Sequence, residues 1–571
     1  MKLRTSFCNG TVLKKDITRF APVWGIYTVF LFLVITRFGS RYPANNAADV
    51  LDFAMLMLWG NLIYAFLCAT MLLGDLFNTR MCNALHALPL RRDNWLTTHA
   101  IAGLLFSLVP NLLATLVMAL LCGPYFYIAL IWLAAVTLQY LFFFGSAMFS
   151  AMCAGNRLGM LAVYGILHFF SMLVYLLYNQ FYEPLLYGIR LDIAGFMFFS
   201  PVVHLTREDL VVFTRLPSTP SGETLGVWGG FCPESWYYLF AIALIGMGLA
   251  ALAYALYRRR KLEAAGDFIA ICALRPVILV IYTLGVGAVM YGFCALFGVS
   301  SSYIFLLVGL IVGYFTGHML LERRVSVFRK KTFLGFGAFA LAILLSLGLT
   351  RLDPFNITRF VPEAEKVVSV RVYNSSDYYL FEQTDRPCYE FTDPEQIAFW
   401  SGIHRDLLTA NNNDHHENTE VRIQYRLESG RTVTRYYPIW ESNPHFETFR
   451  TYFSSYAYLF PEYDTELADH IYMAEVSLHD MGMAEWEYKT LVITDREELR
   501  ALMQAVKADA DAGNLAQSFI FHRYENQNGW IMLSTDNQAI THYNYDITFY
   551  PSSQHLTAFI REYLAEQQQT Q

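Results

Sequence analysis

Three groups of residues in this chain have the types and spacing that chemistry could use. The segment HRDLLTAN at 404–411 matches the catalytic-loop pattern of protein kinases letter for letter. The segment DHHE at 414–417 offers carboxylates and imidazoles of the kind that bind metal ions. His168 and His318 are the clearest titratable side chains inside apolar segments, with His99 nearer a segment end, and such groups can carry protons through a membrane.

None of these groups has the partners that its chemistry needs. The kinase-like segment lies on a helix expected to begin at Thr392, and neither a glycine-rich loop nor a DFG motif accompanies it. Neighbouring ligands such as those of 414–417 rarely reach one ion, and no HExxH frame exists, so a solvated loop is favoured. A lone histidine in a span more often packs or bonds between helices than relays protons. We therefore expect no enzymatic activity, no metal and no cofactor in this chain.

The composition divides the chain into two parts that suit different surroundings. Of 571 residues, 55% are hydrophobic and 16% are charged, against about 25% charged in ordinary soluble domains. Residues 1–350 hold 24 Lys+Arg and 14 Asp+Glu, whereas residues 351–571 hold 17 and 34. The acidic second part argues against nucleic-acid binding, because phosphate groups need positive partners. The nine cysteines form no CxxC pair, which predicts neither a disulfide framework nor a zinc site.

Nine apolar segments are long enough to cross a bilayer, which takes about 20 apolar residues. They lie at about 21–38, 51–74, 96–121, 125–151, 158–178, 237–257, 276–298, 302–321 and 332–350. With the N-terminus inside, the cytoplasmic pieces are 1–20, 75–95, 152–157, 258–275 and 322–331. These pieces carry 19 of the 24 basic residues of this part, so we expect a cytoplasmic N-terminus and an extracytoplasmic C-terminal domain.

The longest external connection, residues 179–236, contains a further apolar stretch at Ile193–Val203. This stretch is too short to span a bilayer. An interfacial or re-entrant piece and a plain external loop both fit it.

The polar stretch Asp75–Trp95, between the second and third spans, has the pattern of a short amphipathic helix. Four apolar residues recur at helical spacing and predict one face: Phe77, Met81, Leu85 and Leu88. The opposite face carries Asn78, Cys82, Asn83 and His86. Pro89 ends the expected helix, and a basic pair follows. A partner protein could push on such a cytoplasmic helix, although an ordinary interfacial loop helix would show the same pattern.

Several elements of the first 267 residues follow one another in a particular order. A basic amphipathic segment at Leu13–Phe20 precedes two spans and a cytoplasmic helix that closes with LPLRR at 88–92. Four further spans follow, and the sixth ends in RRRKLEAAGD at 258–267. This order resembles the membrane subunit of bacterial ABC-2-type transporters over about residues 10–267. Three added spans and an external domain depart from the six-span pattern, and some Gram-positive permeases look similar in that respect.

The resemblance implies partners that this chain alone lacks. In that family the helix between spans two and three docks on the ATP-binding subunit, so Leu76, Arg80, Leu88, Pro89 and Arg91 would belong to that contact. This chain has no GxxxxGK[ST] phosphate loop, and ATP is therefore expected in a separate ATPase. A second permease, forming a homodimer or heterodimer, and the bilayer of a bacterial cell are the other partners implied.

Beyond Arg351 the pattern becomes that of an α+β domain built from two tandem repeats. FTDPEQIAFW at 391–400 aligns with ITDREELRAL at 493–502, an offset of about 102 residues. Both segments have capping-box spacing at a helix start: Thr392 with Glu395, and Thr494 with Glu497.

Each repeat also carries a hairpin signal and a closing helix. The hairpins are expected within Val421–Tyr437 and Phe519–Ser534, and the helices near Pro444–Tyr456 and Ser552–Leu564. The repeat units are therefore expected at about 366–460 and 472–565.

The sequence predicts a polytopic α-helical membrane protein of about nine spans, followed by an extracytoplasmic α+β domain. Its expected parts are a six-span permease domain (1–267), three additional transmembrane helices (268–350) and the external domain (351–571). The favoured function is the permease subunit of an ATP-driven exporter of an amphipathic compound, peptide or lipid. The alternative is a membrane-anchored sensor or interaction protein whose external repeats bind a ligand.

Overall fold

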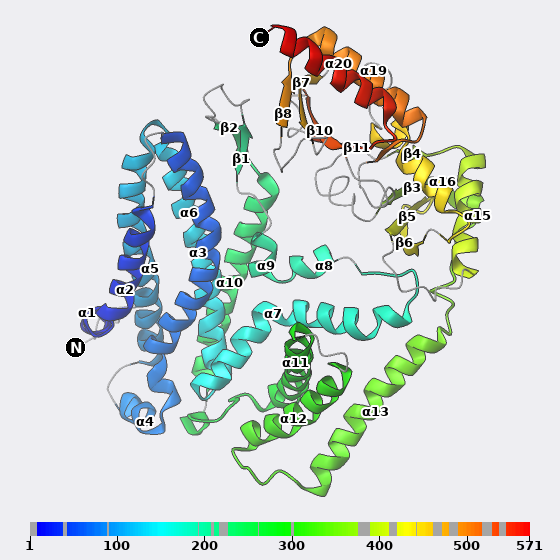
Figure 1. Ribbon diagram of the computed structural model, residues 1–571. Coiled ribbons are helices and arrows are strands. Elements are labelled where there is room, and N and C mark those ends of the chain that lie inside the picture. The colour runs from blue at the N-terminus through cyan, green and yellow to red at the C-terminus, as the bar shows by residue number, and fades with distance from the viewer. Residues whose placement is uncertain are drawn as a thin grey trace. The chain divides into compact units, whose positions relative to one another are not determined.

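The chain divides into a helical unit and an α+β unit (Figure 1). The computed structural model describes residues 8–37, 43–87, 91–191, 193–206, 211–215, 226–260, 262–297, 302–374, 389–409, 419–440, 442–460, 471–478, 489–516, 528–535 and 544–570. The helical unit comprises Met1–Phe181 and Asp192–Ser346, and the α+β unit comprises Tyr182–Leu191 and Leu347–Gln571. This division differs from the expected one in two ways. Residues 1–267 and 268–346 form one unit, and a segment from the middle of the helical part belongs to the α+β unit.

The helical unit is a helix bundle that also contains one small two-stranded sheet. Its helices are α1 (Gly10–Arg19), α2 (Ala21–Ile35), α3 (Pro43–Leu72), α4 (Thr79–Ala87), α5 (Arg92–Cys122), α6 (Phe126–Cys153), α7 (Arg157–Phe181), α8 (Ile193–Phe198), α9 (Pro201–Leu205), α10 (Pro233–Arg259), α11 (Arg275–Leu296), α12 (Ser302–Glu322) and α13 (Lys330–Leu352). Short 3-10 turns are η1 (Gly74–Phe77), η2 (Gly123–Tyr125), η4 (Leu262–Ala264) and η5 (Cys272–Leu274). Strands β1 (Val211–Arg215) and β2 (Gly226–Phe231) pair antiparallel.

These helices have the length and composition of membrane spans. Among the described residues, seven segments are long and apolar enough to cross a membrane, or eight if α1 and α2, bent by 59°, count as one span. One of the seven, Arg92–Cys153, contains both α5 and α6, which pack against each other. Each of the nine apolar segments expected from the sequence coincides with one helix. The chain is therefore a membrane protein with an α+β unit outside its apolar helices.

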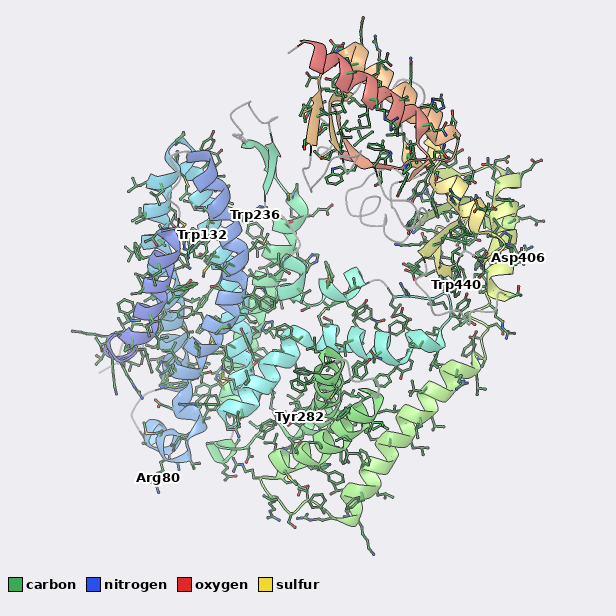
Figure 2. All side chains as sticks on the ribbon, in the orientation of Figure 1. Arg80, Trp132, Trp236, Tyr282, Asp406 and Trp440 are labelled. Carbon is green, nitrogen blue, oxygen red and sulfur yellow. The ribbon has the colours of Figure 1, made fainter. Side chains whose placement is uncertain are left out.

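Helix α6 forms the centre of the bundle and packs against α3, α5 and α10. Large side chains such as Trp132 and Phe143 are fully buried there (Figure 2). The crossing with α10 depends on two glycines instead. A Cβ atom on Gly145 would lie 2.0 Å from the carbonyl oxygen of Gly246, so the two backbones touch. Small residues at helix crossings allow this close approach in apolar surroundings, where packing drives helix association.

The α+β unit contains two antiparallel sheets. The first has β3 (Val367–Asn374), β4 (Glu390–Phe391), β5 (Thr419–Leu427) and β6 (Thr432–Ile439), with α15 (Pro394–Thr409), α16 (Phe446–Phe453) and α17 (Tyr456–Leu459). The second has β7 (Ile471–Leu478), β8 (Lys489–Ile493), β9 (Leu515–Ala516), β10 (Gly529–Thr535) and β11 (Asn544–Phe549), with α19 (Arg496–Asp511) and α20 (Gln554–Thr570). The strand orders are β4-β3-β5-β6 and β8-β7-β10-β11-β9. Apart from the short β9, the two orders match strand for strand, and the sheets coincide with the two expected repeat units.

The starts of α15 and α19 lie one residue beyond the expected caps. The side chain of Asp393 accepts a bond from the Gln396 amide at 3.3 Å, and that of Asp495 accepts bonds from the Glu497 and Glu498 amides. The expected capping threonines, Thr392 and Thr494, are therefore wrong. An aspartate cap satisfies the free amides equally well and adds a negative charge at the helix N-terminus, where the helix dipole favours it.

The second expected hairpin is also wrong. Strand β10 has β7 on one side and β11 on the other, so it turns into β11, while Phe519–Tyr524 lies outside the described residues. Asn528 extends the ladder between β10 and β11, since its amide donates to the Phe549 carbonyl. Gly529 is required by close packing, because a Cβ atom there would lie 2.2 Å from the carbonyl oxygen of Ser477.

Candidate functional site

The stretch Asp75–Trp95 folds as η1, a capping residue and α4. Asn78 begins α4, because its Oδ1 accepts bonds from the amides of Arg80 (2.9 Å) and Met81 (3.4 Å). Asparagine is among the best residues for this position. The helix is short and ends at Ala87, and α5 starts at Arg92. The sequence therefore indicated the right place for a separate small helix.

The expected contact residues are spread over this stretch. Leu76, in η1, is buried, whereas Arg80 on α4 and Arg91 just before α5 are exposed; Figure 2 shows Arg80 at the end of the helical unit. Leu88 and Pro89 lie outside the described residues. The two arginines are thus available to a partner. The buried side chain of Leu76 holds η1, the turn that precedes α4 and that we call the foot of α4, against the bundle.

The expected faces of α4 are confirmed only in part. Phe77 packs against the core, whereas Met81 is 45% exposed and Cys82, assigned to the polar face, is only 2% exposed. The side chains of Leu85 and Leu88 lie outside the described part of the chain. The Thr79 hydroxyl donates to the carbonyl of Ala265 at 3.4 Å, so this side of α4 faces the segment around η4. A small, weakly polar thiol fits that crowded contact better than the long methionine side chain does.

Arg260 ties the foot of α4 to the rest of the bundle. Its guanidinium donates to the carbonyls of Ala151 (2.7 Å) and Met152 (3.5 Å) in the last turn of α6, and to that of Leu76 (3.4 Å) in η1. The Arg92 guanidinium in turn donates to the Arg260 carbonyl at 3.4 Å. A cation at the end of α6 also neutralises the partial negative charge of unsatisfied carbonyls there. The side chain and the carbonyl of Arg260 thus join η1, which precedes α4, to the ends of α5, α6 and α10.

Burial shifts the pKa values of Arg260 and Cys82 in this contact. Desolvation lowers the pKa of the Arg260 guanidinium, which nevertheless stays charged, because arginine is not deprotonated in proteins. Desolvation also raises the pKa of the Cys82 thiol, against the opposing pull of Arg260 and Arg92. The thiol therefore behaves as a small apolar group and not as a nucleophile.

The turn between α6 and α7 is clamped by the segment that follows Arg260. The Gly266 amide donates to the Gly155 carbonyl at 2.6 Å, and the Ala270 amide donates to the Cys153 carbonyl at 2.8 Å. A Cβ atom on Gly159 would lie 1.8 Å from the Phe268 carbonyl oxygen, so α7 has no room for a side chain at this position. The contact is made by backbone on backbone and cannot adjust by changing rotamers.

Asp267 extends this network to the later helices. Its carboxylate pairs with Arg275 at the start of α11 (3.3 Å) and with Arg323 just after α12 (3.2 Å). The ends of α4, α5, α6, α10, α11 and α12 therefore meet in one connected region, which we call the α4 end of the helical unit. Most groups that join them there are basic.

A buried carboxylate joins α1 to α5 near the same end. Asp16 Oδ2 lies 2.6 Å from His99 Nδ1, and both side chains are buried. Composition did not indicate this pair, although Asp16 lies on the apolar face of Leu13–Phe20, three residues after Leu13. His168 packs among the rings of Phe142, Phe143 and Tyr164, and its Nε2 lies 3.1 Å from the Ser146 hydroxyl. His168 thus occupies a packed interhelical position.

Strand β6 holds both chain segments that lead from the helical unit into the α+β unit. The Tyr436 amide donates to the Gly188 carbonyl at 3.1 Å, and Arg190 pairs with Glu420 at 2.5 Å, so the segment after α7 lies along this sheet. Arg435 donates to the carbonyls of Ile357 (3.0 Å) and Phe360 (3.4 Å) in the segment after α13. We call β6 with these two segments the β6 junction.

Gly188 fits the β6 junction because it lacks a side chain. Its φ of +75° lies in the region that favours glycine, and a Cβ atom there would lie 2.8 Å from the Tyr437 ring. Sequence patterns do not indicate this contact, since 182–191 has the composition of a loop and its partners are more than 200 residues away.

In the kinase-like segment, His404 packs in the core and Asp406 lies at the surface. His404 lies in α15, fully buried, with Nδ1 3.0 Å from the Tyr425 hydroxyl and Nε2 2.8 Å from the Tyr437 hydroxyl. Asp406 (Figure 2) is exposed and pairs with His445 at 3.0 Å. In the part of the chain that the structure describes, no three His, Cys, Asp or Glu side chains gather as a metal site, and residues 414–417 lie outside that part.

We expect the first sheet of the α+β unit to lose stability in acid because of His404. Burial, aided by Arg435 and Arg405, lowers the pKa of His404 to about 3, below the usual value of about 6.5. Between these values the unfolded chain binds a proton that the folded chain rejects. Stability is thus complete above pH 6.5 and falls as pH drops towards 3, by roughly tenfold in the unfolding equilibrium per pH unit. Hydrogen exchange of β5 and β6 amides, corrected for intrinsic rates, measures this fall between pH 7.5 and 5.

The variant His404→Gln should be less stable at pH 7.5 but should lose the pH dependence, since glutamine does not titrate. His445→Gln, at the surface, should keep the dependence of the wild type. An unchanged pH dependence in His404→Gln would show that another group carries the effect.

Comparison of the chain with protein-family models, with curated proteins and with solved structures found no match.

Proposed function

We propose that this chain is the permease subunit of an ATP-driven ABC exporter in a bacterial cell membrane, energised by a separate ATPase. The observation that carries the proposal is the construction of α4. This helix presents Arg80 to solvent, while Arg260 fastens its foot to the ends of α5, α6 and α10. A force applied to α4 would therefore reach several long helices at once.

In this proposal nine helices cross the membrane: α2, α3, α5, α6, α7, α10, α11, α12 and α13. The N-terminus and α4 are cytoplasmic, and the α+β unit is extracytoplasmic. The basic groups at the α4 end support this orientation, because positive residues near span ends stay in the cytoplasm. The alternation of the nine helices then sends the segments after α7 and α13 outside, where both join the β6 junction.

The transported compound is an amphipathic molecule, peptide or lipid, moved by a pair of permease subunits. ATP binding draws the two partner ATPases together, and each pushes on one α4. The rigid backbone contacts between the α6–α7 turn and residues 264–270 carry this movement to α7. Through Tyr182–Leu191 it then reaches the β6 junction, so the external unit senses or gates the substrate in step with ATP hydrolysis.

Reversing the exposed charges of the α4 stretch should release the ATPase. The double variant Arg80→Glu with Arg91→Glu should insert normally into the membrane, because neither side chain is buried. Arginine is enriched among the interface residues whose loss costs more than about 1 kcal/mol, and two reversed charges also repel the partner, so the ATPase recovered with the tagged chain from its own host should fall at least tenfold. Quantitative mass spectrometry of the purified complex measures the recovery.

The matched control is Arg259→Glu with Arg324→Glu, which makes the same charge change on exposed residues outside α4. It should lower recovery less than twofold. Undiminished recovery in the α4 variant rules out the assigned contact, and equal losses in both variants would indicate a general need for positive charge.

A membrane-anchored sensor is the second candidate, and the β6 junction favours it. Two covalent connections converge on one strand, so a ligand that shifts the first sheet would pull on α7 and α13 together. A sensor needs no ATPase. A neighbouring reading frame that encodes both GxxxxGK[ST] and LSGGQ would favour the exporter, and its absence together with ATPase-free purification would favour the sensor.

A further inference from the structure

An open apolar groove runs along the first half of α13. It has a volume of about 760 Å³ and is lined by Phe328, Phe333, Leu334, Gly337, Ala338 and Leu341, with Lys330 at one end. The apolar lining residues from Phe333 to Leu341 recur every three or four positions, so they lie on one face of α13, and Phe328 precedes the helix. Gly337 leaves the floor open, because a Cβ atom there would meet nothing within 4 Å.

The groove faces outwards from the helical unit. Only 6% of the most apolar stretch of α13 is buried against the rest of the chain, the lowest share among the candidate spans. Leu334 is 78% exposed and Leu341 56% exposed, so the apolar surface here is continuous. On a helix that crosses a bilayer, exposed apolar surface of this kind contacts the acyl chains of lipids.

The end of the groove carries positive charge that the chain itself leaves partly unmatched. Arg323 pairs with Asp267 and Arg329 lies 3.8 Å from Glu322, but neither Lys330 nor Lys331 forms an ion pair with any described residue. Lys330 therefore sits where an apolar groove meets a basic end. An anionic headgroup with an attached acyl chain complements both features.

A second copy of the chain complements them less well. Two copies share one orientation in a membrane, so their α13 helices would pair in parallel and bring Lys330 next to Lys330. Like charges at that position oppose the contact. A phospholipid of the same leaflet meets no such repulsion.

We propose that the α13 groove binds an anionic phospholipid, with one acyl chain along Phe333–Leu341 and the headgroup phosphate on Lys330. This inference requires that α13 lies in a bilayer, but it does not depend on an ATPase partner. It adds a lipid site on α13 that uses none of the residues assigned to the ATPase contact.

Photo-crosslinking of the full chain in nanodiscs tests the site. The probes are phosphatidylglycerol and phosphatidylcholine that carry the same diazirine acyl chain, and peptide mapping locates the label. We expect residues 328–341 to be labelled about fivefold more by phosphatidylglycerol, the preference that one lysine provides. Lys330→Gln should remove this preference, and Lys331→Gln, the same change on a residue outside the groove, should lower it less than twofold.

A second pair of variants tests the acyl chain. Gly337→Leu fills the groove and should cut labelling of 328–341 by both lipids at least fivefold, while Gly348→Leu, equally uncrowded on the same helix, should not. Equal losses in the two lysine variants would indicate diffuse attraction only and would overturn the site. Labelling that Gly337→Leu leaves unchanged would also overturn it. So would an unlabelled groove with a native-mass dimer, which would assign this face to a second copy.

Discussion

Replacing Arg260 with methionine is expected to detach the foot of α4 from the bundle. The change removes the guanidinium that bonds Leu76 of η1 and Ala151 of α6, and it leaves these carbonyls without that donor. Hydrogen bonds to a charged group contribute about 1.5–3 kcal/mol each. A local loss of about 3 kcal/mol corresponds to roughly a 100-fold increase in the open form of α4.

Cys82 reports this opening directly. Its side chain is 2% exposed in the closed form, so maleimide labels it only when α4 moves away. The loss of Arg260 also removes a positive charge that lowers the thiol pKa, which by itself would slow the reaction. Faster labelling in Arg260→Met therefore reports exposure and not a more reactive thiol. The measurement is the maleimide rate of a chain in which Cys82 is the remaining cysteine.

Two further variants separate the effect of the two-pronged guanidinium geometry from the effect of its positive charge. Arg260→Lys keeps the charge but cannot reach both helices with the same geometry, so its labelling rate should lie between those of wild type and Arg260→Met. Arg259→Met, the same change on the exposed neighbour, should label at the wild-type rate within twofold. If Arg260→Met labels as slowly as wild type, Arg260 does not hold α4.

Arg260 also shows what the sequence could and could not predict about the site. The run RRRKLEAAGD marks a span end, and hydrophobic periodicity identified α4 and the long helices, because these patterns are local. Which arginine of the run turns inwards depends on where α10 ends and on carbonyls 109 and 184 residues away. The placement of Cys82 on the polar face of α4 was wrong for the same reason. Cys82 is buried by tertiary contacts, which override its local pattern.

In the α+β unit, local alternation predicted the strands but not their neighbours. The sequence of β10 has the same alternation whether its hairpin partner is β11 or Phe519–Tyr524. Alternation determines which side chains of a strand are buried, but it does not determine which strand pairs with it. The contact of the segment Tyr182–Leu191 with the first sheet could not be predicted from the sequence. Its contacts with β5 and β6 use backbone groups, a glycine and an ion pair, none of which changes hydrophobic periodicity.

The crossing of α6 and α10 should be highly sensitive to an added side chain. Gly246→Ala places a methyl group 2.4 Å from the Cα atom of Phe142 and 2.7 Å from the Leu141 carbonyl oxygen, if nothing moves. Both are backbone atoms of α6, so no rotamer change relieves the clash and the helices must separate. Overpacking in a dense core costs about 1–3 kcal/mol, and this site, which admits no side-chain relief, belongs at the upper end.

Gly248→Ala provides a matched control two residues along the same helix. A Cβ atom there meets nothing within 4 Å, because a step of two residues turns the side chain about 200° away from α6. In a helix interior alanine is more favourable than glycine by about 0.5–1 kcal/mol. Gly248→Ala should therefore leave stability unchanged or raise it slightly, while Gly246→Ala lowers it.

Thermal unfolding of the two variants in detergent separates the effect of the clash with α6 from the general effect of replacing glycine by alanine in α10. Both add one methyl group to α10 and change the same residue type, so any difference in unfolding midpoint reports the side that faces α6. A lower unfolding midpoint in Gly246→Ala with an unchanged or higher midpoint in Gly248→Ala would confirm that backbone contact at Gly145 and Gly246 holds α10 to α6. Equal shifts would mean that the helices do not touch there. Because Arg260 follows directly after α10, a displaced α10 should also speed the labelling of Cys82, which links the core of the bundle to the α4 end.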